Sequence, residues 1–272
     1  MGQRPPRAVE EVYAPDAVHE DLADPAARRQ GHAERLEVER RLHTRLPDRA
    51  VEVLRLLELD GRQAVLECLV RGTSSTDPGR SATPALLWWW LDGEGRVCRE
   101  LAWFRWRDRR PDDGKVAGTL AQPRPPGPPR PEAEAEDEVR SQSWYRAYAA
   151  HLVETWSWDP VLADRSLYDE ACVVESATRP GRALRGLDAL EAADTALASQ
   201  LPSPHRQLQA LDVLGEGRAL AVRVALEGRD QGRGPLRRAY GALLLTLDGS
   251  DRVISNRSYL DWDGAVTVDD PG

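Results

Sequence analysis

Four polar or small side chains alternate along residues 252–262, a segment with the period of a β-strand. Ser255, Arg257, Tyr259 and Asp261 share one face of this predicted strand, because successive side chains of a strand point to opposite faces. A carboxylate that faces an apolar cavity is desolvated, which makes it a better proton acceptor. Abstraction of a proton beside a carbonyl group needs such a base. Arg257 either holds a substrate beside Asp261 or forms a structural ion pair with it.

Further candidates lie in the first half of the chain. His19 is on a short alternating segment and either faces a ligand or is a buried, satisfied histidine. His19, His32 and His43 do not have the spacing of a metal site, so no metal is expected. Three consecutive tryptophans, at 88 to 90, alternate across a strand, with the middle one facing away from the other two. A packed core or an interface explains them better than an aromatic ligand does.

Composition excludes several classes of protein. The chain has 272 residues, with 37 Lys and Arg against 45 Asp and Glu, a net charge of −8. This charge disfavours nucleic-acid and anionic-membrane partners, and no run of 18 apolar residues predicts a membrane span. The N-terminus has no apolar core and does not resemble a signal peptide. The three cysteines form no disulfide framework or metal knuckle, so we expect a cytoplasmic protein.

The chain reads as two copies of one domain around a linker. Residues 109–138 contain a proline-rich stretch and then an acidic run, neither of which can bury apolar surface. The flanks repeat each other at an offset of 155 or 156 residues. Tyr13 matches Tyr168, and Gly31 matches Gly186. A nearly constant offset over so long a stretch indicates a duplicated domain. The predicted domains are 1–108 and 139–265, with a tail at 266–272.

Each copy has the pattern of helices followed by strands. In the second copy, apolar residues recur every four positions and predict a helix near 140–158. Asp159-Pro160 opens a short helix, and leucines mark a third helix that ends at Pro202. Strands are predicted at 218–228, 236–248 and 252–262. This order predicts an α+β layer, with helices on one face of a curved sheet. The first helix of the first copy is mostly missing, so either the true start lies upstream of Met1 or this half is supported from elsewhere.

The two copies, with YAPDAVHED near the start and ISNRSYLDWDG near the end, resemble the SnoaL-like branch of the nuclear transport factor 2-like superfamily. The resemblance covers both halves over nearly their whole length. It implies two tandem cone-shaped α+β barrel domains, each a curved antiparallel sheet wrapped by helices around an apolar pocket. The superfamily includes polyketide cyclases, ketosteroid isomerases, epoxide hydrolases and non-catalytic modules, so the fold alone does not assign a function.

The resemblance also implies two carboxylate positions. Asp21 matches the base of ketosteroid isomerases, where the second copy has Ser176. Asp261 matches the acid/base of SnoaL-type cyclases, where the first copy has Arg105. Each half thus keeps one candidate carboxylate. Asp48 matches a further carboxylate of epoxide-opening members, although turn formation before the next strand explains it better.

Substrate-binding groups follow from the same resemblance. Tyr148 lies on the helix where ketosteroid isomerases place a tyrosine donor, and the tryptophans of the first copy, including Trp103, donate only through their indole nitrogens. Arg257, Tyr259 and His19 complete the predicted substrate-binding set. SnoaL-type cyclases carry a histidine on the strand before Asp261, and this chain has none there.

Taken together, these features predict a small-molecule enzyme of cyclase or isomerase type. It would use acid/base chemistry on an apolar carbonyl compound, without a cofactor, and the second copy would be the working half. The alternative is a non-catalytic module of the same fold that binds an apolar ligand or mediates dimerisation. The expected partners are an apolar small molecule and a second copy in a homodimer, with no nucleic acid and no membrane.

Overall fold

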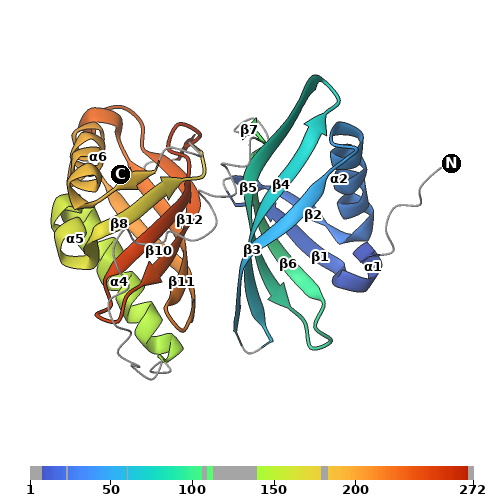
Figure 1. The fold of residues 1–272 in the computed structure, drawn as a ribbon, viewed down its shortest axis with the longest axis horizontal. Coiled ribbons are helices and arrows are strands. Elements are labelled where there is room, and N and C mark those ends of the chain that lie inside the picture. The colour runs from blue at the N-terminus through green and yellow to red at the C-terminus, as the bar shows by residue number, and fades with distance from the viewer. Residues whose placement is uncertain are drawn as a thin grey trace. The chain divides into compact units, whose positions relative to one another are not determined.

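The computed structural model describes residues 8–22, 24–59, 61–105, 109–112, 140–178 and 183–268. The chain divides into two compact units, Met1–Ala121 and Gln122–Gly272, here called unit 1 and unit 2. Each unit contains one twisted sheet with its helices on one face (Figure 1). The face against which the helices pack is called the inner face. This is the α+β arrangement that the sequence predicts.

Unit 1 is built on a sheet with the strand order β2-β1-β6-β5-β4-β3, and β7 pairs with β5. The helix α2 lies across its inner face (Figure 1). The elements are α1 Ala8–Val12, β1 Tyr13–Asp21, β2 Asp24–Gln30, α2 Gly31–Arg45, β3 Ala50–Leu59, β4 Gln63–Ser74, β5 Asp77–Leu91, β6 Val97–Phe104 and β7 Arg110–Pro111.

Unit 2 repeats this order as β10-β11-β12-β13-β8-β9, and β14 pairs with β12. Three helices cover its inner face and close a continuous apolar core around Tyr145, Leu152 and Leu220. The elements are α4 Gln142–Trp158, α5 Pro160–Leu167, β8 Tyr168–Ser176, β9 Leu184–Arg185, α6 Leu187–Gln200, β10 Gln207–Glu216, β11 Ala219–Gly228, a 3-10 turn Asp230–Gly232, β12 Arg237–Leu247, β13 Val253–Leu260 and β14 Val266–Thr267.

Local sequence explains where the helices of unit 2 begin. Ser141 caps α4, with its hydroxyl accepting the backbone N–H of Trp144 at 3.3 Å. Asp159 caps α5 in the same way through the N–H of Leu162, and Pro160 occupies the first turn, as the sequence predicts. The apolar side of α4 then packs on β10.

The sheets differ from the predicted antiparallel barrels in two respects. One pair in each sheet is parallel, β1 with β6 and β8 with β13. Both sheets are also open, because their strand orders end on unpaired edges. β1 and β8 each follow a helix, so no hairpin imposes an antiparallel direction on them.

The unit boundaries also differ in detail from the sequence prediction. Arg110–Pro111, assigned to the linker, pairs with β5, and Val266–Thr267, assigned to the tail, pairs with β12. These short strands are 156 residues apart, so they belong to the duplicated pattern. Residues 113–138 and 269–272 of the predicted linker and tail lie outside the described residues.

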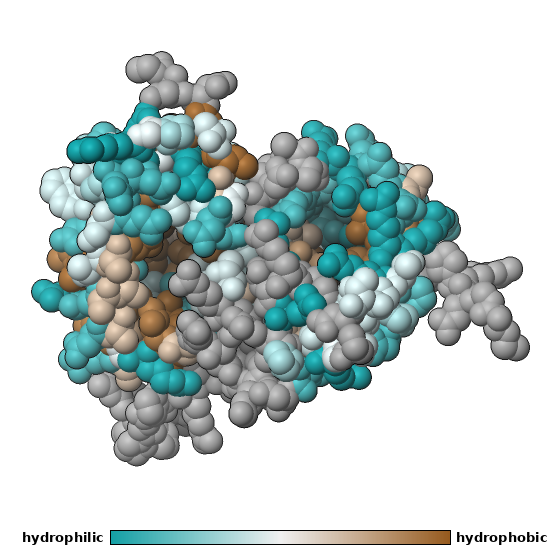
Figure 2. All heavy atoms as spheres, turned by 90° about the horizontal axis from the view of Figure 1, so that it is seen from above, coloured by the Kyte–Doolittle hydropathy of each residue, from teal (hydrophilic) through white to brown (hydrophobic). Residues whose placement is uncertain are grey.

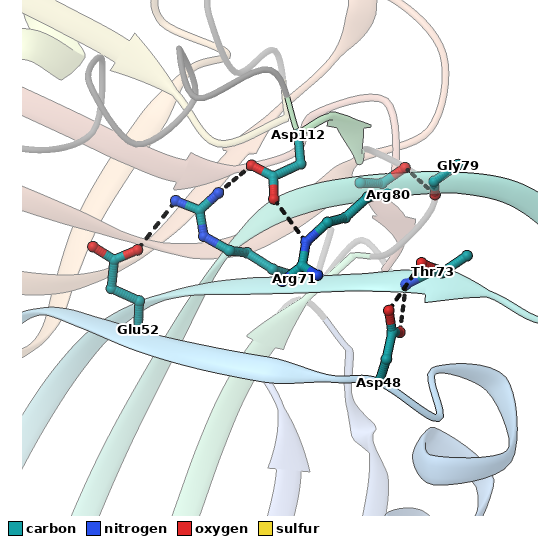
Figure 3. Close-up of polar contacts among 8 residues, drawn as sticks. Asp48, Glu52, Arg71, Thr73, Gly79, Arg80 and Asp112 are labelled. Carbon is teal, nitrogen blue, oxygen red and sulfur yellow. Dashed lines mark hydrogen bonds and ion pairs between the residues drawn. The ribbon is translucent and has the colours of Figure 1, made fainter.

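A polar cluster fastens the end of β7 to the sheet of unit 1 (Figure 3). The Asp112 carboxylate contacts the guanidinium of Arg71 on β4, and its other oxygen accepts from Nε of Arg80 on β5 at 3.1 Å. Beside it, Asp48 accepts the backbone N–H and the hydroxyl of Thr73 at 2.7 and 2.9 Å. Asp48 therefore holds a turn against β4, the role that the sequence favours for it.

Two further features of the molecule are the apolar character of its helices and the hydropathy of its surface. Within the described residues, no helix has the length and apolar character needed to cross a membrane. Among the coloured residues of the face seen in Figure 2, hydrophilic ones predominate and hydrophobic ones form groups.

Candidate functional site

Unit 1 contains a cavity of about 330 Å³ between α2 and the inner face of its sheet. Alternate residues of β4, β5 and β6 form its apolar floor, because every second side chain of a strand reaches the same face. Charged side chains from β1, β6 and α2 surround one end. The floor consists of Cys68, Val70, Ala85, Leu87, Ala102 and Phe104, and the polar end includes His19, Glu20, Asp21, Arg35, Glu39 and Glu100.

Glu100 is the centre of the polar end and is 1% exposed. Its Oε2 accepts from the Tyr13 hydroxyl at 2.6 Å and from Trp89 Nε1 at 2.8 Å. Its Oε1 lies 3.1 Å from Nη1 of Arg35 and 3.4 Å from Nδ1 of His19. Four polar groups from three elements, β1, β5 and α2, thus surround one buried carboxylate.

These donors keep Glu100 ionised. Burial alone raises the pKa of a carboxyl group, but His19, Arg35, Tyr13 and Trp89 outweigh it and lower the pKa of Glu100 to about 2. Burial and the neighbouring Glu100 charge raise the pKa of Tyr13, so its phenol stays protonated and donates. Glu100 is therefore a fixed negative charge that orients its neighbours.

Buried polar atoms of two residues next to Glu100 have no hydrogen-bond partner among the described residues. His19 Nδ1 lies 3.4 Å from Oε1 of Glu100 but forms no hydrogen bond with it. Within the described part of the chain, His19 Nε2 and Arg35 Nε are buried and have no hydrogen-bond partner. Both atoms belong to residues that line the cavity.

The charged groups at the mouth of the cavity are paired with each other. Glu39 bridges Arg35 at 3.0 Å and Arg49 at 2.7 Å. Asp21 lies 3.7 Å from Arg105. Each of these two carboxylates therefore has at least one guanidinium partner.

Cys68 is the one sulfur group on the cavity floor. Its thiol is buried, and burial followed by the charge of Glu67 raises its pKa to about 11. The thiolate is the nucleophilic form of cysteine. Cys68 therefore serves as part of the apolar floor rather than as a nucleophile.

Comparison with known proteins agrees with this architecture. The sequence model of a SnoaL-like domain matches residues 1–110. Unit 1 is a SnoaL-like domain. No match was found among curated proteins.

Several solved structures are similar to parts of the chain. A putative SnoaL-like polyketide cyclase from Jannaschia sp. CCS1 has 19% identity and a TM-score of 0.39, covering 45% of this chain and 90% of its own. A hypothetical protein with a ketosteroid isomerase-like fold from Catenulispora acidiphila, in complex with trimethylamine, has 12% identity and a TM-score of 0.38, covering 43% and 86%. An LEH-like epoxide hydrolase from M. tuberculosis has 14% identity and a TM-score of 0.36, covering 44% and 86%.

The SnoaL-like domain brings together only some of the predicted site residues. His19 and Asp21 both line its cavity. Trp103 is on the opposite face, since its cross-strand partner is Leu86, while the cavity residue Ala102 pairs with Leu87. Arg105, which stands where the second copy has Asp261, is the partner of Asp21.

In unit 2, the predicted site residues of β13 lie on the face of the sheet that points away from the helices. Asn256 pairs with the core residue Leu245, whereas Arg257 and Tyr259 occupy the alternate, outer face. Arg257 pairs with Glu175 at 3.1 Å. Asp261 follows β13, and its Oδ1 accepts the N–H of Gly264 at 3.2 Å. Its role as an acid/base stays a prediction.

Tyr148, the remaining predicted donor of unit 2, serves the packing of α4. Its hydroxyl donates to the backbone carbonyl of Asp251 at 3.0 Å, and its ring stacks on Trp144. This hydrogen bond ties the helix to the turn between β12 and β13 and uses the donor that a ligand would need.

Sequence reasoning missed Glu100 and Arg35. The sequence offered one signal for Glu100: it is a charged residue next to Leu101 in a segment where apolar and polar residues alternate. The duplicated copy shows why the cluster is confined to unit 1. Asn256 pairs with Val174 in unit 2 just as Glu100 pairs with His19 in unit 1.

The second copy thus lacks both the carboxylate and the imidazole at these strand positions. Its remaining contact is a single hydrogen bond from Asn256 Nδ2 to the hydroxyl of Tyr168, at 2.7 Å. The cavity with polar side chains therefore lies in unit 1, whereas the sequence predicts that the second copy is the working half. Within the described residues, no group of three or more His, Cys, Asp or Glu side chains is arranged to hold a metal ion.

Proposed function

We propose that unit 1 is a small-molecule site that performs acid/base chemistry on an apolar carbonyl compound. The observation that carries the proposal is the pair of unpartnered polar atoms, His19 Nε2 and Arg35 Nε, beside an apolar floor. A base and a cationic donor in one desolvated cavity are the two groups that enolisation of a carbonyl compound requires.

The proposed reaction begins with proton removal. His19 Nε2 takes a proton from the carbon beside the carbonyl, the electron pair of the C–H bond forms a carbon–carbon double bond, and the π pair of the carbonyl group moves onto its oxygen. The Nε–H of Arg35 donates to that oxygen. Glu100, next to His19 Nδ1, stabilises the imidazolium that forms. Return of the proton to another atom of the same compound completes an isomerisation, and no cofactor is consumed.

The cavity contains a further group that this chemistry could use. Asp21 also lines the cavity and is a second carboxylate within the same site. Its ion pair with Arg105 assigns it to the mouth, and we propose that it orients the substrate there.

The test uses deuterium exchange, which needs no knowledge of the natural substrate. The probe is 2-tetralone, a bicyclic ketone with acidic hydrogens beside its carbonyl, incubated with the protein in D₂O and followed by NMR. Wild-type protein should accelerate exchange over buffer. His19→Asn should lower that acceleration by about 10²–10⁴-fold, the usual effect of losing a positioned base. His43→Asn is the matched control, because His43 is exposed on the same helix as Arg35 and does not line the cavity.

A second candidate function is non-catalytic binding of an apolar ligand. The ion pairs of Glu39 and Asp21 favour this alternative, because paired carboxylates are poor proton acceptors. Under this alternative, wild-type protein binds 2-tetralone but exchanges its hydrogens no faster than buffer does. That result would overturn the enzymatic proposal and leave the binding function.

A further inference from the structure

Unit 1 has an exposed apolar strip on the edge of its sheet. Val51, Val53 and Leu56 of β3 are 55%, 57% and 53% exposed; these three residues are called the β3 strip. Their cross-strand partners on β4 are Val70, Cys68 and Leu66. Directly opposed residues share a face, so the strip lies on the inner face, the side of the cavity.

The equivalent strand of unit 2 is covered. There the partners of Leu226, Val224 and Val222 are residues 208, 210 and 213 of β10, and all three pack in the apolar core. The cover is α4, which packs along β10. The backbone N–H of Leu208 also donates a hydrogen bond to Ser157 Oγ of α4, at 2.7 Å.

Unit 1 has no such cover within the part of the chain that is described. Its first helix, α1, matches only the end of α5 at the offset of 155 residues, and no described helix matches α4. Both edge strands carry a bulge at the same place, between Val53 and Arg55 and between Ala210 and Asp212. The two edge strands therefore share their pairing and their bulge.

The residue that lies closest to α4 in unit 2 differs in unit 1. In unit 2, α4 approaches so closely that a Cβ atom on Gly215 would lie 2.2 Å from the ring of Tyr145. Gly215 pairs with Leu220, and the equivalent pair in unit 1 is Glu58 with Ala64. Glu58 thus places a long charged side chain where α4 requires no side chain at all.

The strip is continuous with the cavity. Val51 belongs to both, and the strip's partners Cys68 and Val70 form part of the cavity floor. From Val51 to Leu56 the strand extends roughly 16 Å. A ligand held at His19 can therefore continue along an apolar track out to the edge of the sheet.

We propose that the ligand of unit 1 is an elongated molecule with one carbonyl-bearing end and an apolar body longer than the cavity. The polar end lies at His19 and Arg35, and the apolar body lies over the β3 strip, in the place that α4 fills in unit 2. This inference rests on the proposed function, because it takes the His19 end of the cavity as the binding site for the polar group.

The experiment measures dissociation constants for a series of straight-chain methyl ketones, from 2-octanone to 2-hexadecanone. Each buried methylene should tighten binding by about fourfold. In the wild type, affinity should keep rising with each methylene even for ketones that are too long to fit inside the cavity. Val53→Ser and Leu56→Ser should remove the gain for the long ketones and leave 2-octanone unaffected, since neither residue lines the cavity. Leu211→Ser, at the bulge of β10, is the matched control.

The outcomes separate this inference from the proposed function. If 2-octanone binds but longer ketones bind no tighter, or if the strip variants bind long ketones as well as the wild type does, the elongated ligand is refuted and the proposed function stands. If none of the ketones binds, both are overturned. If Leu56→Ser instead halves the particle mass measured by light scattering, with unchanged binding of 2-hexadecanone, the strip is an interface between copies and the inference fails.

Discussion

Replacing Glu100 with glutamine tests whether its charge organises the site. Glu100→Gln keeps the shape of the side chain but removes the negative charge beside Arg35 and His19. Arg35 then stays largely buried without one of its two carboxylate partners. Removal of one member of a buried pair costs several kcal/mol, because an uncompensated charge remains.

The magnitude follows from the pKa of Glu100. Its pKa falls from an ordinary 4.5 to about 2 in the folded protein. At about 1.4 kcal/mol per pH unit, the ionised form contributes about 3 kcal/mol to the free energy of unfolding of unit 1. Because the folded pKa is lowered, this contribution is complete above pH 4.5 and is lost as the pH falls through 2. The variant should therefore be less stable by about 3 kcal/mol at pH 7, with the difference shrinking towards pH 2.

Urea unfolding at several pH values measures this difference, and hydrogen exchange of Val97–Phe104 assigns it to β6. Glu94→Gln is the control, because Glu94 is 73% exposed and forms only a surface ion pair with Arg96. It should change stability by less than about 1 kcal/mol. Equal stability of Glu100→Gln and wild type at pH 7, or a difference that persists at pH 2, would refute the reasoning.

The remaining predictions concern packing, charge and domain organisation. Gly215→Ala should destabilise unit 2 by about 1–3 kcal/mol in thermal unfolding, because the new methyl group collides with the Tyr145 ring. Asp164→Asn should raise the melting temperature above neutral pH and have little effect at pH 4. Burial and the Asp194 charge raise the pKa of Asp164, so ionisation of the wild-type carboxyl costs stability as the pH rises. Limited proteolysis followed by mass spectrometry should cut first within 113–138 and release two fragments.

Matched controls accompany these three experiments. Gly249→Ala should leave stability nearly unchanged, since a Cβ atom there meets nothing within 4 Å. Asp263→Asn, at an exposed position, should not reproduce the pH dependence of Asp164→Asn. A first cut inside 186–262 would contradict the two-domain organisation, and equal melting curves for Gly215→Ala and wild type would contradict the packing of α4 on β10.

Sequence alone determined the order of elements and their repetition. Alternation at 218–228 and 252–262 predicts the strands observed at Ala219–Gly228 and Val253–Leu260. Asp159-Pro160 predicts the start of α5. These features depend on local periodicity and capping, which neighbouring residues set among themselves. The offset between Tyr13 and Tyr168 then predicts two units of one plan, and both units begin their sheets at these residues.

Tertiary structure decided which side of each strand became the inside. Alternation places Arg257 and Tyr259 on one face, but it does not say which face the helices cover, and the helices cover the other. The buried cluster of unit 1 joins Glu100 to Tyr13, a residue 87 positions away. Such contacts arise from parallel pairing of β1 with β6 and from the packing of α2, neither of which leaves a local trace in the sequence. The site therefore lies where long-range pairing brings charges into an apolar space, and only the folded chain shows that place.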